Sequence, residues 1–73
     1  MSILPVTSAR EVLRKLLRGG FRIVSQKGSH VKLRNDRTGC VTNVPLHCAD
    51  IGRKLLMKII KQAGLSVEEF LDL

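Results

Sequence analysis

The region around His30 carries the side chains best suited to chemistry, because an imidazole stands there between a glycine turn and several cations. An imidazole changes charge near neutral pH, so it can serve as a general acid or base. Apolar and polar residues alternate from His30 to Arg34, and a period of two predicts a half-buried strand. Side chains two residues apart share a face of a strand, so we expect Val31 and Leu33 to face the core. The outward face would then carry His30, Lys32 and Arg34.

The three residues before His30 are Lys27, Gly28 and Ser29, and they suit a turn that binds an anion. Glycine can adopt a positive φ and lets the backbone approach a ligand closely. Ser29 could act as a nucleophile only with a base and a group that orients the base, and the sequence shows no such arrangement. We therefore expect its hydroxyl to stabilise the turn or to donate a hydrogen bond to phosphate.

The charge balance of the chain points to a polyanionic ligand. Thirteen Lys and Arg residues against six Asp and Glu residues give a formal net charge of +7, which favours nucleic acid. Membrane surfaces and acidic proteins also attract cations. No apolar run approaches the roughly 18 residues that a membrane span needs. Aromatic residues make up 3% of the chain, too few to stack unpaired bases, which disfavours a single-strand binder.

The length and the cysteine content indicate a small domain without a metal. Seventy-three residues make a single domain, which we expect to span residues 1–73. The chain shows no signal peptide, so a cytoplasmic protein is expected. Cys40 and Cys48 lack the paired spacing of a zinc site, which favours reduced thiols. Nothing in the sequence indicates a small-molecule cofactor.

Local start and stop signals predict three helices and three strands. Ser8 and Glu11 have the spacing of a capping box, and Ser66 and Glu69 repeat it before the last helix. Turn-forming residues at 35–39 should join the second and third strands. The expected elements are a helix that ends at Gly19-Gly20, strands at 21–26, 30–34 and 40–46, a helix from Asp50 to Gly64, and a short final helix.

Both long helices are expected to be amphipathic. Their apolar faces carry Val12, Leu13, Leu16 and Leu17 in the first helix and Ile51, Leu55, Leu56, Ile59, Ile60 and Ala63 in the second. The opposite face of the second helix carries Arg53, Lys54, Lys58 and Lys61. Cations in the first turn of a helix oppose its dipole, so this face suggests an anionic ligand.

These elements predict an α+β fold in the order α-β-β-β-α, followed by a short C-terminal helix. Because the helices can bury their apolar stripes only against the sheet, we expect an antiparallel three-stranded sheet with both long helices on one face. The other face and an edge strand would remain open to a partner.

Three separated motifs resemble those of the HicA toxin family. They are Gln26-Lys27-Gly28-Ser29-His30, Val44-Pro45-Leu46-His47 and Ile60-Lys61-Gln62-Ala63-Gly64-Leu65-Ser66-Val67-Glu68-Glu69-Phe70, and the similarity runs from about Ser8 to Leu73. The resemblance implies a double-stranded-RNA-binding-domain-like fold, ribosome-independent cleavage of mRNA, and neutralisation by a cognate HicB antitoxin. It also implies that His30 is the catalytic residue. Residues 47–54 depart from the family pattern, which leaves the start of the second helix open.

The residues also fit metal-independent RNA cleavage. This reaction needs a base for the ribose 2′-hydroxyl, cations for the phosphorane and a proton for the leaving 5′-oxygen. His30 can be the base or the acid, while His47 could complete an acid–base pair but is more simply a structural residue. The chain shows no carboxylate cluster that could hold magnesium, which disfavours a two-metal nuclease. The expected RNA-binding residues are Lys27, Gly28, Ser29, Lys32, Arg34, Lys54, Lys58 and Lys61.

Two other classes of function remain. A non-catalytic module for double-stranded RNA would use the same fold and the same basic helix, but it would not require an imidazole at His30. A DNA-binding module is a weaker alternative, because the sequence shows no helix-turn-helix or base-reading signature. An RNA-cleavage assay separates the first alternative from a nuclease.

Overall fold

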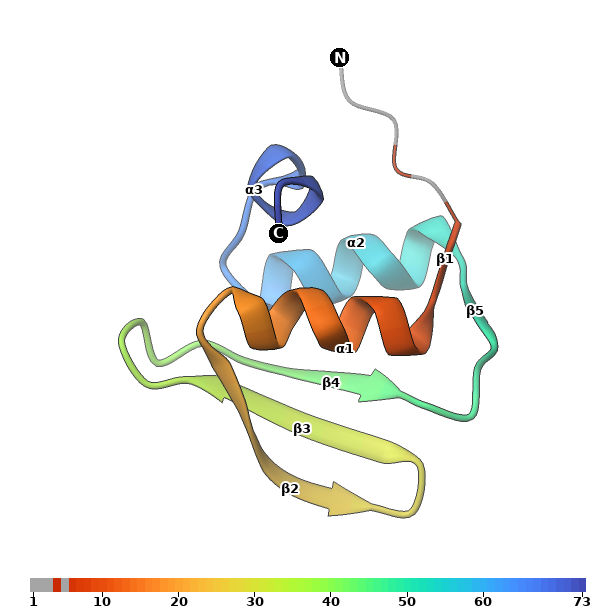
Figure 1. Cartoon of the computed structure of the whole chain (residues 1–73), viewed down its shortest axis with the longest axis horizontal. Helices are drawn as coiled ribbons and strands as arrows, with labels where there is room; N and C mark the ends of the chain where they lie inside the picture. Colours follow the sequence, from red (N-terminus) through yellow and green to blue (C-terminus); the bar gives the residue numbers. More distant parts are fainter. Residues whose placement is uncertain (1–3, 5) are drawn as a thin grey trace.

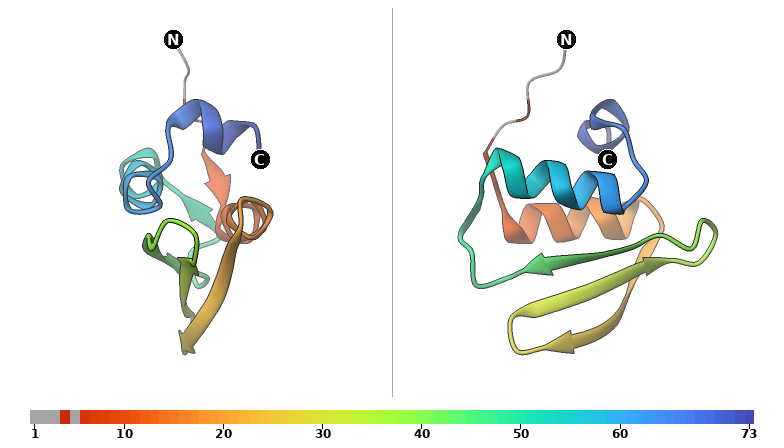
Figure 2. Two further views of the ribbon diagram at one scale, coloured as in Figure 1. Left: turned by 90° about the vertical axis from the view of Figure 1, so that its left-hand side faces the viewer. Right: turned by 180° about the vertical axis from the view of Figure 1, so that it is seen from behind.

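The computed structural model describes residue 4 and residues 6–73. The elements in chain order are β1 (Thr7–Ser8), α1 (Ala9–Arg18), β2 (Phe21–Lys27), β3 (His30–Asn35), β4 (Val41–Pro45), β5 (Asp50–Ile51), α2 (Arg53–Gln62) and α3 (Val67–Leu71). Strands β2, β3 and β4 form an antiparallel sheet in that order. Both long helices cover one face of this sheet, and α3 lies beyond them, on the side away from the strands (Figures 1 and 2). The predicted α+β architecture is confirmed.

The core lies between the sheet and the two long helices. In β3, buried and exposed residues alternate, so that Val31 and Leu33 are fully buried while the residues between them face solvent. The helices contribute the residues expected from their periodicity, and Phe70 of α3 closes the far side. The largest fully buried side chains are Val12, Leu16, Val31, Leu33, Thr42, Val44, Ile51, Leu56, Ile59, Ile60 and Phe70.

Strand β2 is an edge strand that runs away from the helices (Figure 2). Phe21 at its start is buried, but Ile23 is 44% exposed and Val24 is 38% exposed. A break in register between Ile23 and Ser25 marks a bulge, which bends and twists a strand. On α1, Leu17 is 45% exposed, so the prediction that it belongs to the buried face is wrong. Helical spacing places Leu17 at the margin of the apolar face, whose buried residues are Ala9, Val12 and Leu16.

The segment before α2 differs from the prediction. Asp50 and Ile51 are not helical but form β5, which pairs antiparallel with Thr7 and Ser8 of β1. The helix begins only at Arg53, after the extended residue Gly52. Ile51 is nevertheless fully buried, because the short β1–β5 ladder holds it against the core while satisfying the backbone groups around it.

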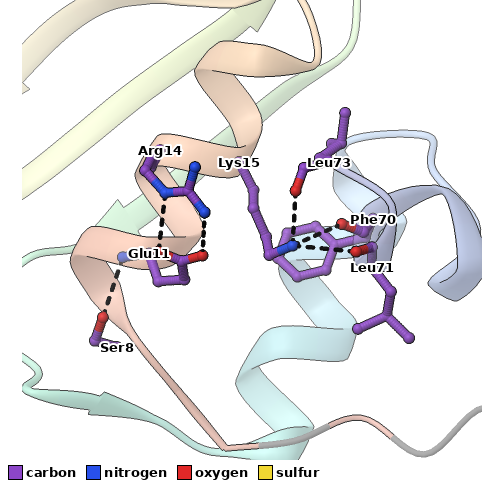
Figure 3. Close-up of polar contacts among 7 residues, drawn as sticks. All are labelled: Ser8, Glu11, Arg14, Lys15, Phe70, Leu71 and Leu73. Carbon is purple, nitrogen blue, oxygen red and sulfur yellow. Dashed lines mark hydrogen bonds and ion pairs between the residues drawn. The ribbon is translucent and has the colours of Figure 1, made fainter.

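The two predicted capping boxes have different outcomes. The Ser8 hydroxyl accepts a hydrogen bond from the backbone N–H of Glu11, but the Glu11 carboxylate pairs with Arg14 (Figure 3). Before α3, the reciprocal bonds between Ser66 and Glu69 are both present. Both serines therefore cap their helices, and only the second site is a complete capping box.

Lys15 connects α1 to the C-terminal end of α3 (Figure 3). Its ammonium donates to the carbonyl oxygens of Leu71 at 3.2 Å and Leu73 at 2.9 Å, and it lies 5.5 Å from the centre of the Phe70 ring. The last carbonyls of a helix lack partners within the helix, and a cation satisfies them while complementing the helix dipole. Lys15 thus fixes the layer formed by α3 onto the rest of the fold.

Replacing Lys15 with methionine should lower the free energy of unfolding by about 1–2 kcal/mol, because the charged hydrogen bonds are lost while the apolar stem remains. The measurement is urea unfolding followed by circular dichroism. Arg10→Met removes an exposed cation from the same helix and should change stability by about 0.5 kcal/mol or less. Equal losses in the two variants would show that the contacts of Lys15 with α3 do not stabilise the fold.

Candidate functional site

A tight turn between β2 and β3 positions His30. Lys27 and His30 are directly opposite in the register, so the loop consists of Gly28 and Ser29 alone. Gly28 has a φ of 61°, and no non-glycine residue of the described chain has a positive φ, which matches a type II′ hairpin turn. The Gln26 side-chain amide also donates to the Gly28 carbonyl at 3.1 Å. His30 is therefore the first residue of a strand held by a short and well-defined turn.

The outer face of the sheet is basic. His30, Lys32 and Arg34 are exposed and project from β3 on the side opposite to the buried residues Val31 and Leu33, as their alternation with buried residues predicts. The register with β2 places Lys27 opposite His30, and the register with β4 places Asn43 opposite Lys32. Lys27 and Lys32 are thus the cations nearest to His30 within the sheet.

Arg34 lies at the other end of β3, four residues or about 13 Å of extended strand from His30. Asp36 pairs there with both Arg34 and Arg22. The hydrogen bond from Arg22 holds the pKa of the Asp36 carboxyl below its usual value, which strengthens its preference for the ionised form. Arg34 therefore has an acidic partner, and it is too distant to stabilise charge beside His30.

Helix α2 contributes a second wall to the site. An open pocket of about 190 Å³ is lined by His30, Asn43, Pro45, Leu55, Lys58, Ile59 and Gln62. The buried hydroxyl of Thr42 on β4 lies 3.4 Å from the Ile59 carbonyl oxygen and 3.1 Å from the Gln62 side-chain oxygen, which fixes α2 along this strand. Lys58 thus shares a pocket with His30, although the two residues are 28 positions apart in the sequence.

Lys54 and Lys61 do not line this pocket. Their spacing from Lys58 is four and three residues, so all three lysines lie along one exposed face of α2. At the start of the helix, Arg53 donates to the Leu4 carbonyl oxygen at 3.0 Å, and the first turn contains no acidic residue. The lysines form a cationic row that extends away from the pocket in both directions along the helix.

His47 lies beside His30, in the turn after β4. The ring centres of the two histidines are 5.3 Å apart, and the Nδ1 atom of His47 is 3.0 Å from the Ser29 hydroxyl. The sequence alone favours a structural role for His47 and shows no base near Ser29. The hairpin register contains the missing signal: if His30 pairs with Pro45, continuing the count places His47 next to the turn at Gly28 and Ser29.

The described part of the chain shows few other features that could bind a metal or a membrane. No group of three or more His, Cys, Asp or Glu side chains among these residues is arranged to hold a metal ion. Cys40 and Cys48 are both free and half-buried. No helix in the described residues has the length and apolar character needed to cross a membrane.

The comparison with known protein families identifies the chain. The family model described as HicA toxin of bacterial toxin–antitoxin matches residues 9–65 of the 73 residues, a region that includes the β2–β3 turn, the β4 end and all of α2. A comparison with curated proteins found no match. The family match covers most of the chain and agrees with the resemblance of the three sequence motifs. The chain therefore belongs to the HicA toxin family of bacterial toxin–antitoxin systems.

Proposed function

We propose that this protein is the toxin of a type II toxin–antitoxin system and acts as a metal-independent endoribonuclease on mRNA, which inhibits translation and growth. The observation that carries the proposal is the environment of His30. This exposed imidazole lines a pocket with Lys58 and lies at the end of a basic sheet face. Membership of the HicA toxin family supports the toxin role.

The pocket suits a segment of a polymer better than an enclosed small molecule. Its volume of about 190 Å³ is below the roughly 300–1,000 Å³ typical of small-molecule sites, and one side is open. Lysines continue beyond it along α2 and across the sheet. A polyanion could therefore place one phosphodiester beside His30 and extend its neighbouring phosphates along these lysines.

In the proposed reaction, His30 takes the proton from a ribose 2′-hydroxyl, and the 2′-oxygen attacks the adjacent phosphorus. Negative charge then grows on the phosphoryl oxygens. Lys58 across the pocket and Lys27 opposite His30 are the cations best located to stabilise this charge. Lys32, Lys54 and Lys61 would bind flanking phosphates, while Gly28 lets the backbone of the turn approach the RNA closely.

The direct test is incubation of the purified protein with RNA in the presence of EDTA. We expect cleavage to continue and to leave 2′,3′-cyclic phosphate ends, because the attacking group is the 2′-oxygen. RNA that carries a 2′-deoxyribose at the cleaved position should be resistant for the same reason. Binding of double-stranded RNA without any cleavage would instead support the non-catalytic module.

The proposed partner is a HicB-like antitoxin that covers His30 and the basic surface. The outer edge of β2 has no strand paired with it among the described residues, and Ile23 and Val24 are exposed there. An unpaired edge can accept a strand from a partner, and acidic residues on that partner would complement the lysines. Adding the antitoxin to the cleavage assay should stop the reaction. A complex that leaves His30 open and cleavage unimpaired would exclude this mode of neutralisation.

A further inference from the structure

The turn after β4 holds His47 in a fixed position relative to His30. His30 pairs with Pro45 in the sheet, and the Leu46 N–H donates to the Ser29 carbonyl at 2.7 Å, which extends the pairing beyond the end of the strand. The Cys48 N–H then donates to the Pro45 carbonyl at 3.1 Å and closes the turn that carries His47. Backbone hydrogen bonds therefore hold the backbones of His30 and His47 close together.

The Ser29 hydroxyl orients the His47 ring. It lies 3.0 Å from Nδ1, so this nitrogen already has a hydrogen-bond partner and Nε2 is the ring nitrogen left to exchange a proton. A hydroxyl can accept a hydrogen bond from an Nδ1–H in both the cationic ring and the neutral ring that remains after Nε2 loses its proton. Both histidines are exposed, so a ligand can reach them.

From this arrangement we infer that His47, positioned by Ser29, is the general acid that protonates the leaving 5′-oxygen while His30 acts as the base. Each group needs to come within about 2.6–3.2 Å of its own oxygen. The attacking and leaving oxygens are bonded to the same phosphorus, and rings centred 5.3 Å apart can both reach one phosphodiester. The inference rests on the proposed RNA cleavage and assigns its second proton transfer.

The proposed cleavage needs no reactant other than the RNA and the two histidines. A ring nitrogen of His30 takes the 2′-hydroxyl proton as the bond from the 2′-oxygen to phosphorus forms. The bond from phosphorus to the 5′-oxygen then breaks, and that oxygen receives the Nε2 proton of cationic His47. The products are a 2′,3′-cyclic phosphate and a 5′-hydroxyl. Proton exchange with water returns both histidines to their starting states.

The test compares two RNA substrates at a mapped cleavage site, one with the natural 5′-oxygen and one with sulfur in its place. A thiolate leaves without being protonated, because a thiol is far more acidic than an alcohol. His47→Ala should lower cleavage of natural RNA by about 10²–10⁴-fold but cleave the sulfur substrate within about tenfold of the unchanged protein. His30→Ala should be slow on both substrates. His47→Gln, which keeps a polar side chain at this position, should behave as His47→Ala does.

The role of Ser29 is tested with the same substrates. Ser29→Ala should lower kcat on natural RNA about tenfold with little change in KM, and the sulfur substrate should remove this defect. Ser29→Thr keeps a hydroxyl and should restore most of the rate. Ser25→Ala, which changes an exposed serine on β2, should match the unchanged protein. A defect in KM alone would make Ser29 a phosphate-binding residue and not a positioning residue.

The outcomes separate this inference from the proposed function. If the unchanged protein cleaves neither substrate, the proposed RNA cleavage is wrong, and the assignment of a general acid fails with it. If the unchanged protein cleaves both substrates, two results would overturn the assignment of His47. One is that His47→Ala loses the same factor in rate on both substrates, and the other is that His47→Ala cleaves natural RNA at the full rate. Circular dichroism and thermal unfolding of each variant show whether a loss of rate reflects a loss of fold.

Discussion

Replacing His30 with alanine should lower RNA cleavage by about 10²–10⁴-fold, which is the usual contribution of a general base. The protein should remain folded, because the side chain is exposed at the end of a strand and such changes usually alter stability by about 0.5 kcal/mol or less. RNA binding should persist, since the lysines that contact phosphates are unchanged. Growth arrest should disappear together with cleavage.

Four measurements on the His30→Ala protein check this expectation: cleavage rate, RNA affinity, thermal unfolding and growth of cells that express it. Arg37→Ala is a suitable control, because Arg37 is exposed in the turn at the opposite end of the β3–β4 hairpin. A folded His30→Ala protein that cuts RNA at the original rate would remove His30 from the mechanism. A protein that fails to fold would make His30 a structural residue.

RNA affinity should depend strongly on salt, because the proposed binding relies on phosphate contacts by lysines, chiefly Lys32, Lys54, Lys58 and Lys61. About four such contacts would lower affinity roughly 50-fold for a single strand and roughly 150-fold for a duplex between about 50 mM and 200 mM salt. The loss should be similar for unrelated sequences, since contacts to phosphate carry no base information. Fluorescence anisotropy at several salt concentrations measures this dependence.

The double variant Lys54→Gln, Lys58→Gln should reduce the slope of log affinity against log salt by about one for each lysine. Arg37→Gln removes one positive charge at the far turn and should leave the slope nearly unchanged. If Lys58 also stabilises the transition state, Lys58→Gln should lower kcat as well, whereas Lys54→Gln should act on binding alone. A slope near zero in the unchanged protein would contradict phosphate-driven binding.

Local sequence patterns determined most of the secondary structure. Alternation around His30 defined which side chains of β3 face solvent, because a strand has a period of two and only one of its faces meets the helices. Serine at the start of α1 and α3 specified where these helices begin, since its hydroxyl satisfies an otherwise unpaired backbone N–H. The motif carrying His30 was likewise visible without a structure.

The conformation or burial of some residues depends on contacts with distant parts of the chain, which no local sequence pattern records. The spacing of Ile51 and Leu55 fits a helix that starts at Asp50, but pairing with β1 makes Ile51 part of a strand. Ile23 has the character of a buried strand residue and remains exposed, because β2 lies at the edge of the sheet and bends away from α1. In both cases the outcome depends on the presence or absence of partners distant in sequence, and such tertiary contacts override local propensity.

In the candidate site, too, some features follow from the local sequence and others only from tertiary contacts. The sequence by itself determined that the protein is basic and that His30 follows a glycine turn on an outward-facing strand. Only the tertiary structure decided which groups surround this histidine. Packing of α2 along β4 brings Lys58 to the pocket, and the hairpin register brings His47 to Ser29, while Asp36 pairs with the more distant Arg34. Composition and periodicity specify the face on which a side chain lies, but proximity between separate elements follows from register and packing, which involve the whole chain at once.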